Sequence, residues 1–437
     1  MKRLTLSELA TADPRTQRFT PYGLSTGTRI LTPESCADLQ QASVGSADLS
    51  DVVPESTRTG FDRLRLFHAY GVLCYELFTI TDDLTWIVLE QALRVRFVAY
   101  YQGAIPIKDR RGNISTFEAP NFEAISAAFR PSGTHYGYKL VISANSSTRM
   151  PLTLDPLLRW AHGVALLDGQ RNRRVQLSVY AETRNHFAHG GNLERLGMPP
   201  DSARAIHDLA EVINRLWGVR TPGGRIYPAP LAREKWILAW DEGWPSQAGS
   251  NFGRFSPERL REEPKDKWRC LIVLGPDADQ NWHDFDARYE VTPYPVDYLW
   301  GPSNAEDALK WLAENEVTQD EVRTNDRIFA IRLDAGRVYL PVRLEILSNV
   351  PDRMRQGIWR LIRADFPNDA HFHARHQARD QPCPDDKYGG CPVSELAQGS
   401  WPDMVREAHK LSPDLGSVPY VDTRAPRRDE YPDDVGC

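Results

Sequence analysis

Cysteine is scarce in this chain, with six residues among 437, and long apolar runs are missing. Six scattered cysteines are too few for a disulfide scaffold at this length, which excludes the disulfide-rich extracellular class. The most apolar stretch, 84–101, is interrupted by charged and amide side chains and falls short of a membrane span. The first ten residues lack the apolar core of a signal peptide. We therefore expect a cytoplasmic protein without a membrane partner.

An excess of positive charge is absent as well. The chain has 53 Lys and Arg residues against 59 Asp and Glu residues, a net charge of −6. That balance gives no global attraction to nucleic acid, although it is compatible with a local basic cleft. Hydrophobic content of 41% and charged content of 26% are typical of globular proteins with sizeable cores. The length predicts two or three domains.

Changes in composition suggest where the domains begin and end. Residues 1–59 are rich in Ser, Thr, Asp and Pro and are interpreted as an N-terminal arm. Residues 60–218 show helical spacing, and 219–232 form a Pro- and Gly-rich linker. Residues 233–365 are β-rich, and 366–437 form a polar C-terminal extension. The predicted fold class is α+β multidomain, with an N-terminal α-helical bundle followed by a smaller β-rich α+β domain of unknown role.

Local patterns predict the individual elements of both domains. In the first domain, apolar spacing predicts helices over 61–78, 84–102, 121–129, 154–167 and 200–217, with Thr81-Asp82-Asp83 as the start of the second. In the rest of the chain, strands are expected at 235–240, 268–274, 289–298 and 328–333, and helices at 304–314, 353–364 and 400–411. Asn304 is the expected cap of its helix.

The stretch Ala181–Asn192, with sequence AETRNHFAHGGN, concentrates residues that carry chemistry. A half-apolar run leads into it, and paired glycines typically end a helix, so Arg184, Asn185 and His189 are predicted on its last turns. Residues four apart share a helix face, which places Asn185 beside His189. An arginine, an amide and an imidazole together bind phosphate, position a ribose and transfer protons near neutral pH.

The pattern R-N-x-x-x-H at a helix end, followed by glycine, resembles the signature of HEPN domains. This resemblance covers roughly 61–218 and says nothing about the C-terminal half. It implies a small helical bundle and metal-independent endoribonuclease activity, without a cofactor, in a toxin or anti-phage defence role. Arg184, Asn185 and His189 would be its catalytic residues, in a cleft completed by a second protomer. The implied partners are RNA, a second copy in a homodimer, and an antitoxin or regulatory protein.

The bare spacing of arginine, four residues and histidine is a weak signal, because the chain matches it twice more. Arg63 and His68 fit it with leucine after the arginine, and Arg130 and His135 fit it in a stretch with Pro and Gly. The stretch at Arg184 alone has the adjacent Asn and the Gly-Gly ending. An alternative remains open here: a basic helix end that simply complements the helix dipole.

Further basic residues flank the motif. Arg171, Arg173 and Arg174 precede it in the sequence QRNRR, and they would contact RNA phosphates if they face the same cleft. A solvated basic face explains them equally well. His186 lies inside the motif and is a candidate RNA contact and second proton carrier. In the resulting hypothesis His189 is the general acid or base, Arg184 stabilises the phosphate charge, and Asn185 orients the substrate.

Two other interpretations stay open. The helical domain is either an enzyme, a non-catalytic RNA- or nucleotide-binding module in a larger assembly, or a structural protein.

In the C-terminal extension, several His and Cys side chains raise the question of zinc, although they lack the paired C-x-x-C spacing, and no metal site is assigned. These residues are His371, His373, His376, Cys383 and Cys391, with the first two expected to alternate on a strand.

Overall fold

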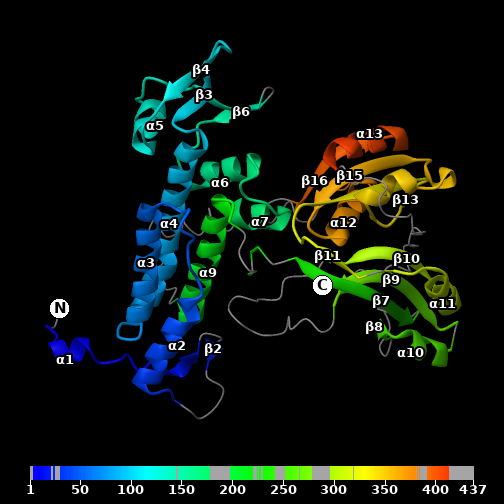
Figure 1. Ribbon diagram of the computed structural model, residues 1–437, viewed down its shortest axis with the longest axis horizontal. Helices are drawn as coiled ribbons and strands as arrows, with labels where there is room; N and C mark the ends of the chain where they lie inside the picture. Colours follow the sequence, from blue (N-terminus) through cyan, green and yellow to red (C-terminus); the bar gives the residue numbers. More distant parts are fainter. Residues whose placement is uncertain are drawn as a thin grey trace. The chain divides into compact units, whose positions relative to one another are not determined.

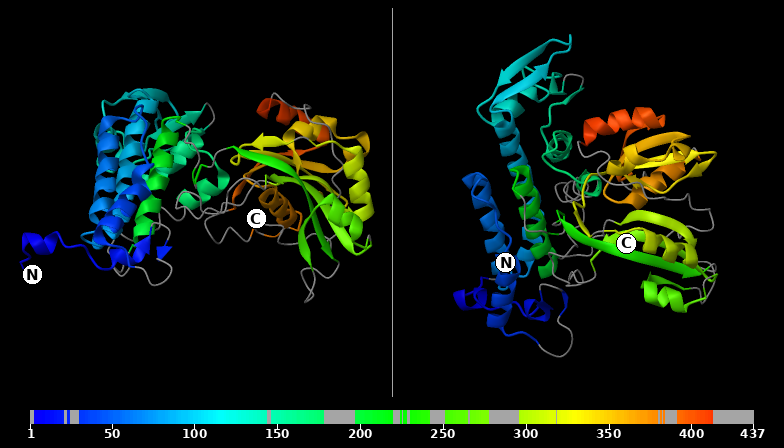
Figure 2. Two further views of the ribbon diagram at one scale, coloured as in Figure 1. Left: turned by 60° about the horizontal axis from the view of Figure 1, so that its bottom comes forward. Right: turned by 45° about the vertical axis from the view of Figure 1, so that its right-hand side comes forward.

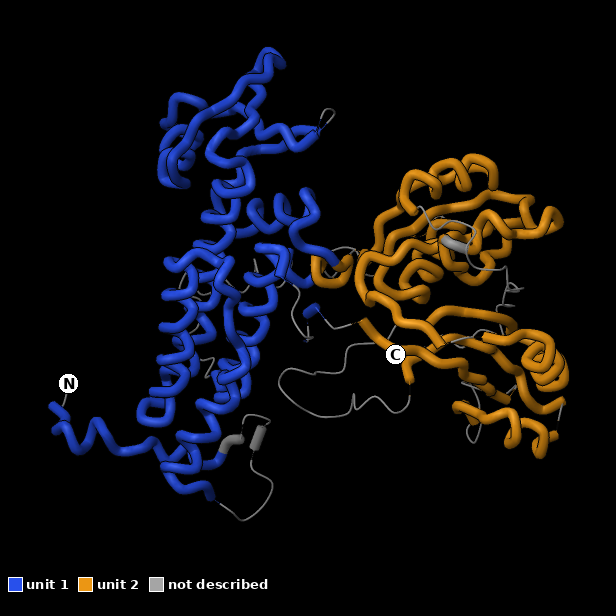
Figure 3. The backbone as a smooth tube through the Cα atoms, in the orientation of Figure 1, with its two compact units in different colours: residues 1–168, 175–227, 283–291 blue, residues 169–174, 228–282, 292–437 orange. Residues whose placement is uncertain are grey.

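The computed structural model divides the chain into two compact units (Figure 3). Unit 1 contains 1–168, 175–227 and 283–291, and unit 2 contains 169–174, 228–282 and 292–437. The structure describes residues 3–20, 23–24, 30–143, 146–177, 197–219, 224, 226–227, 230–241, 251–264, 266–277, 296–317, 319–379, 381, 383 and 391–412. No helix in this described part combines the length and apolar character that crossing a bilayer requires.

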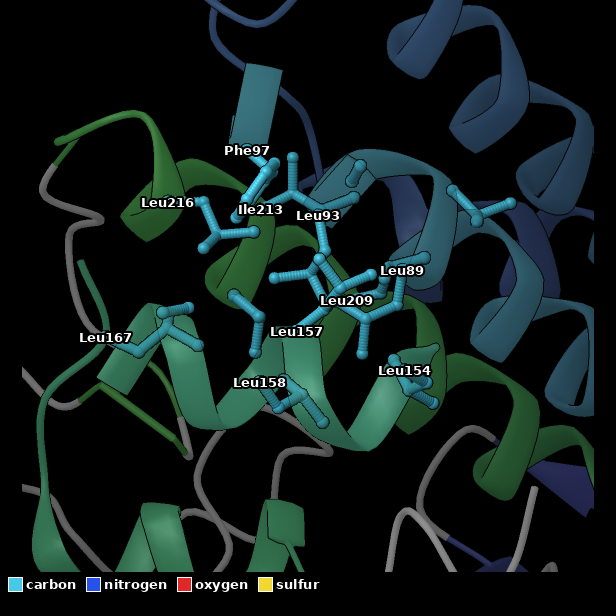
Figure 4. Close-up of a cluster of buried hydrophobic side chains, with 14 of the residues drawn as sticks. Leu89, Leu93, Phe97, Leu154, Leu157, Leu158, Leu167, Leu209, Ile213 and Leu216 are labelled. Carbon is cyan, nitrogen blue, oxygen red and sulfur yellow. The ribbon is translucent and has the colours of Figure 1, made fainter. Parts of the chain in front are cut away.

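One apolar core holds the described helices of unit 1 except α1, which buries no residue (Figure 1). The helices are α1 (Leu6–Leu9), α2 (Pro33–Gly45), α3 (Glu55–Tyr70), α4 (Glu76–Tyr100), α5 (Phe122–Phe129), α6 (Leu154–Gly163) and α9 (Pro199–Leu216). Leu89, Leu93 and Phe97 repeat every fourth residue on α4, so they present one buried stripe to α6 and α9. Figure 4 shows this stripe against Leu157 of α6 and Ile213 of α9.

The boundary between α3 and α4 differs from the sequence prediction. α3 ends at Tyr70 and α4 already begins at Glu76, so Thr81-Asp82-Asp83 lies inside a helix and does not start one. The Thr81 hydroxyl donates to the Leu77 carbonyl at 2.6 Å, a bond that a helix interior also accommodates. Gly71 allows the tight turn between the helices, because a Cβ there would lie 2.5 Å from the Phe78 ring.

A four-stranded antiparallel sheet interrupts the helices of unit 1, which the sequence interpretation of 60–218 as a bundle did not anticipate. Its strands are β3 (Ala104–Lys108), β4 (Ile114–Glu118), β5 (Lys139–Ser143) and β6 (Ser146–Arg149), in the order β4-β3-β5-β6. The β3–β4 turn is closed by the Asp109 carboxylate, which accepts from the backbone N–H of Arg111 at 2.8 Å. Ile105 and Ile107 of β3 join the core of α4. Residues 19–20 and 23–24 (β1 and β2) form a separate two-stranded pair.

Unit 2 begins with an antiparallel sheet in the order β10-β9-β7-β11, with β8 paired to β7. The strands are β7 (Leu231–Asp241), β8 (Phe252–Phe255), β9 (Trp268–Pro276), β10 (Asp297–Asn304) and β11 (Asp320–Val322). α10 (Pro257–Glu262) and α11 (Ala305–Glu314) pack on one face through Leu260, Ala308 and Trp311. The predicted cap is confirmed, because the Asn304 side chain accepts from the Asp307 backbone N–H at 2.8 Å.

The second sheet of unit 2 has the order β13-β12-β15-β16, with β14 paired to β12. Its strands are β12 (Arg327–Asp334), β13 (Arg337–Val338), β14 (Val342–Arg343), β15 (Ile358–Ala364) and β16 (Val393–Gly399). α12 (Pro367–Gln377) covers one face and α13 (Trp401–Leu411) the other (Figure 2). The helix predicted at 353–364 is wrong, because β15 pairs with β12 and β16 there. The sheet therefore continues across the domain boundary expected at residue 365.

The two sheets of unit 2 repeat one arrangement. In each, three consecutive antiparallel strands are followed by a helix that packs back on the last two strands: β7-β9-β10-α11 and β12-β15-β16-α13. In each half the pairing of the first strand with the second begins at an arginine: Arg233 lies opposite Pro276, and Arg327 lies opposite Ala364. The sequence pattern N-x-x-x-F-x-A-R follows the second strand in both halves, at 281–288 and 368–375. The earlier copy, 281–288, lies outside the described residues.

Candidate functional site

The four residues of the predicted motif lie outside the described residues. Arg184, Asn185, His186 and His189 all fall within 178–196, so the structure describes only the chain on either side of them. The side chains that flank this segment are placed in detail: α7 (Gln170–Val175) precedes it, and α9 (Pro199–Leu216) follows it. Their contacts show what holds the two ends of the motif segment.

Residues 170–174 of α7 belong to unit 2, whereas its last residue, Val175, and the chain up to Asp168 belong to unit 1. Asp365, at the end of β15, caps α7: its carboxylate accepts from the backbone N–H groups of Gln170 at 3.1 Å and Arg171 at 2.9 Å. The same carboxylate accepts from the Asp326 backbone N–H at 2.8 Å. Burial raises the pKa of Asp365 to about 6, against the lowering effect of these three backbone donors.

Side chains of α7 also bind unit 2. Arg171 makes a two-pronged pair with Asp369 of α12, with both N–O distances 2.9 Å, and its guanidinium lies 4.5 Å from the centre of the Phe366 ring. The Gln170 amide donates to Asp326 at 2.7 Å and accepts from the Ser394 hydroxyl at 2.8 Å. We call Asp326, Asp365, Asp369 and Ser394 the α7 anchor.

The α7 anchor affects which of the three arginines predicted to contact RNA are accessible to a phosphate. The charged fork of Arg171 is bound to Asp369, so a phosphate contact there would have to displace that carboxylate. Arg174 is half-buried and also takes part in contacts, whereas Arg173 is exposed on the same helix. Of the three, Arg173 is the one whose exposure suits a phosphate contact without rearrangement. The roles of all three in RNA binding stay predictions.

A polar cluster in unit 1 holds the chain at both ends of α7. Just before α7, Asp168 pairs with Arg215 of α9, with a 3.1 Å contact from Arg215 Nε. Just after it, Gln176 is buried and its Oε1 lies 2.8 Å from Nε2 of His162 on α6. Arg215 also lies over the Tyr227 ring, 5.3 Å from its centre. Burial, followed by the charge of Asp168, raises the pKa of the Tyr227 hydroxyl far above its usual range.

The histidines of the two other matches to the R-x-x-x-x-H spacing have structural partners. His68 on α3 is fully buried, and its Nδ1 lies 2.9 Å from the Ser202 hydroxyl of α9. Burial lowers the pKa of His68 to about 4, so the ring is neutral at pH 7. His135 is half-buried, with its ring centre 4.9 Å from Phe117 and 5.5 Å from Phe129. Packing accounts for both rings without a catalytic role.

Unit 2 contains a buried network of arginines and aspartates where its two halves meet. Arg233 of β7 has no exposed side-chain surface and binds Asp297 of β10 at 2.8 Å and Asp320 of β11 at 2.7 Å. Arg327 of β12 also pairs with Asp297, and Arg343 of β14 pairs with Asp320 at 3.2 Å. Burial alone would raise the pKa of Asp297, but the positive charges of Arg327 and Arg233 outweigh it and hold that pKa well below its usual range.

This network joins strands from both sheets and is a structural element. Its members are up to 110 positions apart in the sequence (233 to 343), so no local pattern joins them. Arg233 and Arg327 occupy matching places, because each is the residue at which the first strand of its half begins to pair with the second. A search for internal repeats would have found the shared N-x-x-x-F-x-A-R pattern.

The His and Cys residues of the C-terminal region differ from their prediction. His371 and His373 do not alternate on a strand; they lie on α12, where residues two apart point in different directions. His371 is buried, and burial lowers its pKa to about 3. Cys391 contacts His373, with Sγ and Nδ1 3.4 Å apart. Among the described residues, no three His, Cys, Asp or Glu side chains are placed to share one metal ion.

Comparison with known proteins adds no relative from which a function is transferred. The chain matches no protein-family model, no curated protein and no solved structure. Its functional interpretation therefore depends on its own residues and on the resemblance at 184–189.

Proposed function

We propose that this protein is a metal-independent endoribonuclease whose catalytic residues are Arg184, Asn185 and His189. The observation that carries the proposal is the sequence R-N-H-F-A-H-G-G at 184–191, the one R-x-x-x-x-H match whose arginine is followed by Asn and whose histidine is followed by paired glycines. The other two matches support it indirectly, because the histidines of both are occupied by packing.

The chemistry follows from the residue types. The RNA 2′-hydroxyl attacks the adjacent phosphorus, leaving a 2′,3′-cyclic phosphate and a 5′-hydroxyl end. His189 moves the proton, since an imidazole titrates close to neutral pH. Arg184 stabilises the charge that develops on the phosphate oxygens, a role that suits a planar, permanently charged guanidinium. Asn185 orients the ribose, and His186 is the second proton carrier.

The proposal includes partners. RNA is the substrate, with Arg173 supplying a phosphate contact and Arg171 and Arg174 contributing if the α7 anchor opens. A homodimer would bring two Arg–His sets together across a two-fold axis, which supplies both an acid and a base. A toxin or anti-phage defence role, restrained by an antitoxin or regulatory partner in the cytoplasm, completes the proposal.

The test is cleavage of total RNA or tRNA by the purified full-length protein in EDTA. Arg184→Ala and His189→Ala are compared with Arg63→Ala and His409→Ala, which remove an exposed arginine of α3 and an exposed histidine of α13. We expect both motif variants to lose at least about a hundredfold in rate, as removal of a general acid or base does. The two control variants should cleave like the wild type.

The second candidate function is a non-catalytic RNA- or nucleotide-binding module. It draws on the same residues, because an arginine and an amide grip phosphate with or without turnover. RNA binding by each variant separates the two. An enzyme with His189→Ala keeps its RNA affinity and loses cleavage, whereas a binding module never cleaves and loses affinity with Arg184→Ala.

A further inference from the structure

Three chemically active side chains meet in unit 2, far along the chain from the motif. Cys391 lies two residues before β16, His373 lies on α12, and Glu395 lies on β16. The Cys391 sulfur is 3.4 Å from Nδ1 of His373, and Nε2 of the same ring is 3.9 Å from the Glu395 carboxylate. α12 and β16 are neighbours in the same sheet-and-helix half of unit 2 (Figure 1).

The carboxylate at the far end of this group is itself fixed. Arg360 of β15 binds Glu395 at 3.0 Å, and the two residues lie on adjacent paired strands. His373, Glu395 and Arg360 are mostly buried, with 14%, 26% and 13% of their side-chain surfaces exposed. The imidazole is therefore presented to the thiol by a helix on one side and an ion-paired carboxylate on the other.

The positions of the three groups favour a proton-transfer site over a metal site. A metal ion needs donor atoms that converge on one point. Here the thiol and the carboxylate approach opposite nitrogens of the imidazole, so they cannot both bind one ion with that ring. A nucleophile at one ring nitrogen and a carboxylate at the other is instead the arrangement by which a histidine takes a proton from a nucleophile.

We propose that Cys391 is a reactive thiol toward electrophiles, with His373 as its base and Glu395 as the residue that positions the imidazole. The Cys391 proton passes to Nδ1 of His373, and the imidazolium is stabilised by Glu395 at Nε2. With hydrogen peroxide, the sulfur attacks one oxygen, an S–O bond forms, the O–O bond breaks, and the leaving hydroxide takes the proton as water. The product is a sulfenic acid, so this is a site of reversible oxidation.

The chain supplies its own comparison thiol. Cys74 is exposed, and its thiol donates to a Glu76 carboxylate oxygen at 3.6 Å. Cys36 and Cys270 are buried, and burial raises the pKa of Cys270 to about 12. Cys391 is half-exposed and lies beside an imidazole. If solvent access alone sets the reaction rate, Cys74 will react faster than Cys391. If the neighbouring imidazole sets it, Cys391 will react faster.

The experiment is alkylation of the native full-length protein by iodoacetamide at pH 7, resolved by mass spectrometry of each cysteine peptide. We expect Cys391 to react about tenfold faster than Cys74, because its neighbour promotes the thiolate. His373→Gln should bring Cys391 down to the range of Cys74, and Glu395→Gln should reduce its rate by a smaller factor. His376→Gln, one helical turn further along α12, is the matched control and should leave the rate unchanged.

Hydrogen peroxide, followed by a sulfenic acid trap, should mark Cys391 before Cys74. The proposal is overturned if Cys391 in the wild type reacts no faster than Cys74, or if His373→Gln leaves its rate unchanged in folded protein. Stoichiometric zinc that protects Cys391 from iodoacetamide would also overturn it, in favour of a metal site. Because the wild-type comparison uses two cysteines of one protein, the test remains decisive even if a variant fails to fold.

Discussion

The two units bury polar side chains in different ways. In the described part of unit 1, one apolar cluster joins helices and sheet, and the polar side chains with 0% exposure are all uncharged, including Thr57, His68 and Ser202. In the described part of unit 2, four smaller clusters are joined by charges, and Arg233 with 0% exposure binds two aspartates. Among the described residues, the charged side chain with 0% exposure is therefore that of Arg233 in unit 2, and its burial depends on partners that must both be present.

Removing one buried charge should have the largest effect on stability. Arg233→Ala leaves Asp297 and Asp320 without their shared partner, and breaking a buried pair costs about 3–5 kcal/mol. Hydrogen–deuterium exchange in peptides of β7 and β9 measures this loss within unit 2. Arg261→Ala is the control, because its pair with Glu258 is mostly exposed and its loss should change stability by less than about 0.5 kcal/mol. Equal effects of the two variants would contradict the comparison.

The buried histidine of unit 1 predicts a loss of stability in acid. The pKa of His68 is lowered from 6.5 to about 4 by burial, so the unfolded chain binds the proton more tightly. The stability present above pH 6.5 is lost as pH falls toward 4, by up to about 3 kcal/mol. His68→Gln should make the stability of unit 1 less dependent on pH, as measured by hydrogen–deuterium exchange in peptides of α3 and α9. If the variant loses stability with falling pH as steeply as the wild type does, His68 is not the cause of the loss.

The α7 anchor of unit 2 predicts the opposite slope. Burial raises the pKa of Asp365 from 3.8 to about 6, so the folded state binds the proton more tightly than the unfolded chain. This residue therefore costs stability increasingly as pH rises from about 4 to 6, by up to about 3 kcal/mol. Asp365→Asn should remove that cost. We would measure hydrogen–deuterium exchange in the α7 and β15 peptides of the variant and of the wild type, at pH 4.5 and at pH 7. If the variant differs from the wild type by the same amount at both pH values, Asp365 is not the source of the pH dependence.

The smallest effect is expected at the partly exposed end of the anchor. Arg171→Ala removes the pair with Asp369, in which the arginine side chain is 42% exposed, so its loss should cost only about 1 kcal/mol of α7 stability. Exchange in the α7 peptide is the measurement, and Arg173→Ala on the same helix is the control. If Arg171 instead contacts RNA, its substitution will weaken RNA binding, whereas Arg63→Ala, at the exposed arginine of α3, will not.

Sequence spacing predicted the parts of the fold that depend on local chemistry. The apolar stripe of α9 and the Asn304 cap of α11 are local patterns, and both are present. The helix expected at 353–364 failed because pairing of β15 with two neighbouring strands outweighs helical propensity. The strand predicted at His371 and His373 is wrong because both residues lie on α12, and two histidines two positions apart fit a helix as well as a strand.

Contacts between residues far apart in the chain could not be predicted from the sequence. The anchor joins Arg171 to Asp369 across 198 positions, and no local pattern indicates that Arg171 will be paired. For the same reason, the sequence could nominate Cys391 and His373 as ligands but could not show that Glu395 lies on the other side of the ring. The repeat in unit 2 was detectable from sequence, since N-x-x-x-F-x-A-R recurs, yet it was not found by reading secondary structure alone.

The proposed catalytic residues Arg184, Asn185 and His189 would cleave RNA without a metal. The most direct measurement is the chemistry of the RNA ends produced in EDTA by the wild type and by His189→Ala. We expect 2′,3′-cyclic phosphate and 5′-hydroxyl ends from the wild type and none from the variant. Cleavage that persists unchanged in His189→Ala, or that leaves 5′-phosphate ends, would contradict it.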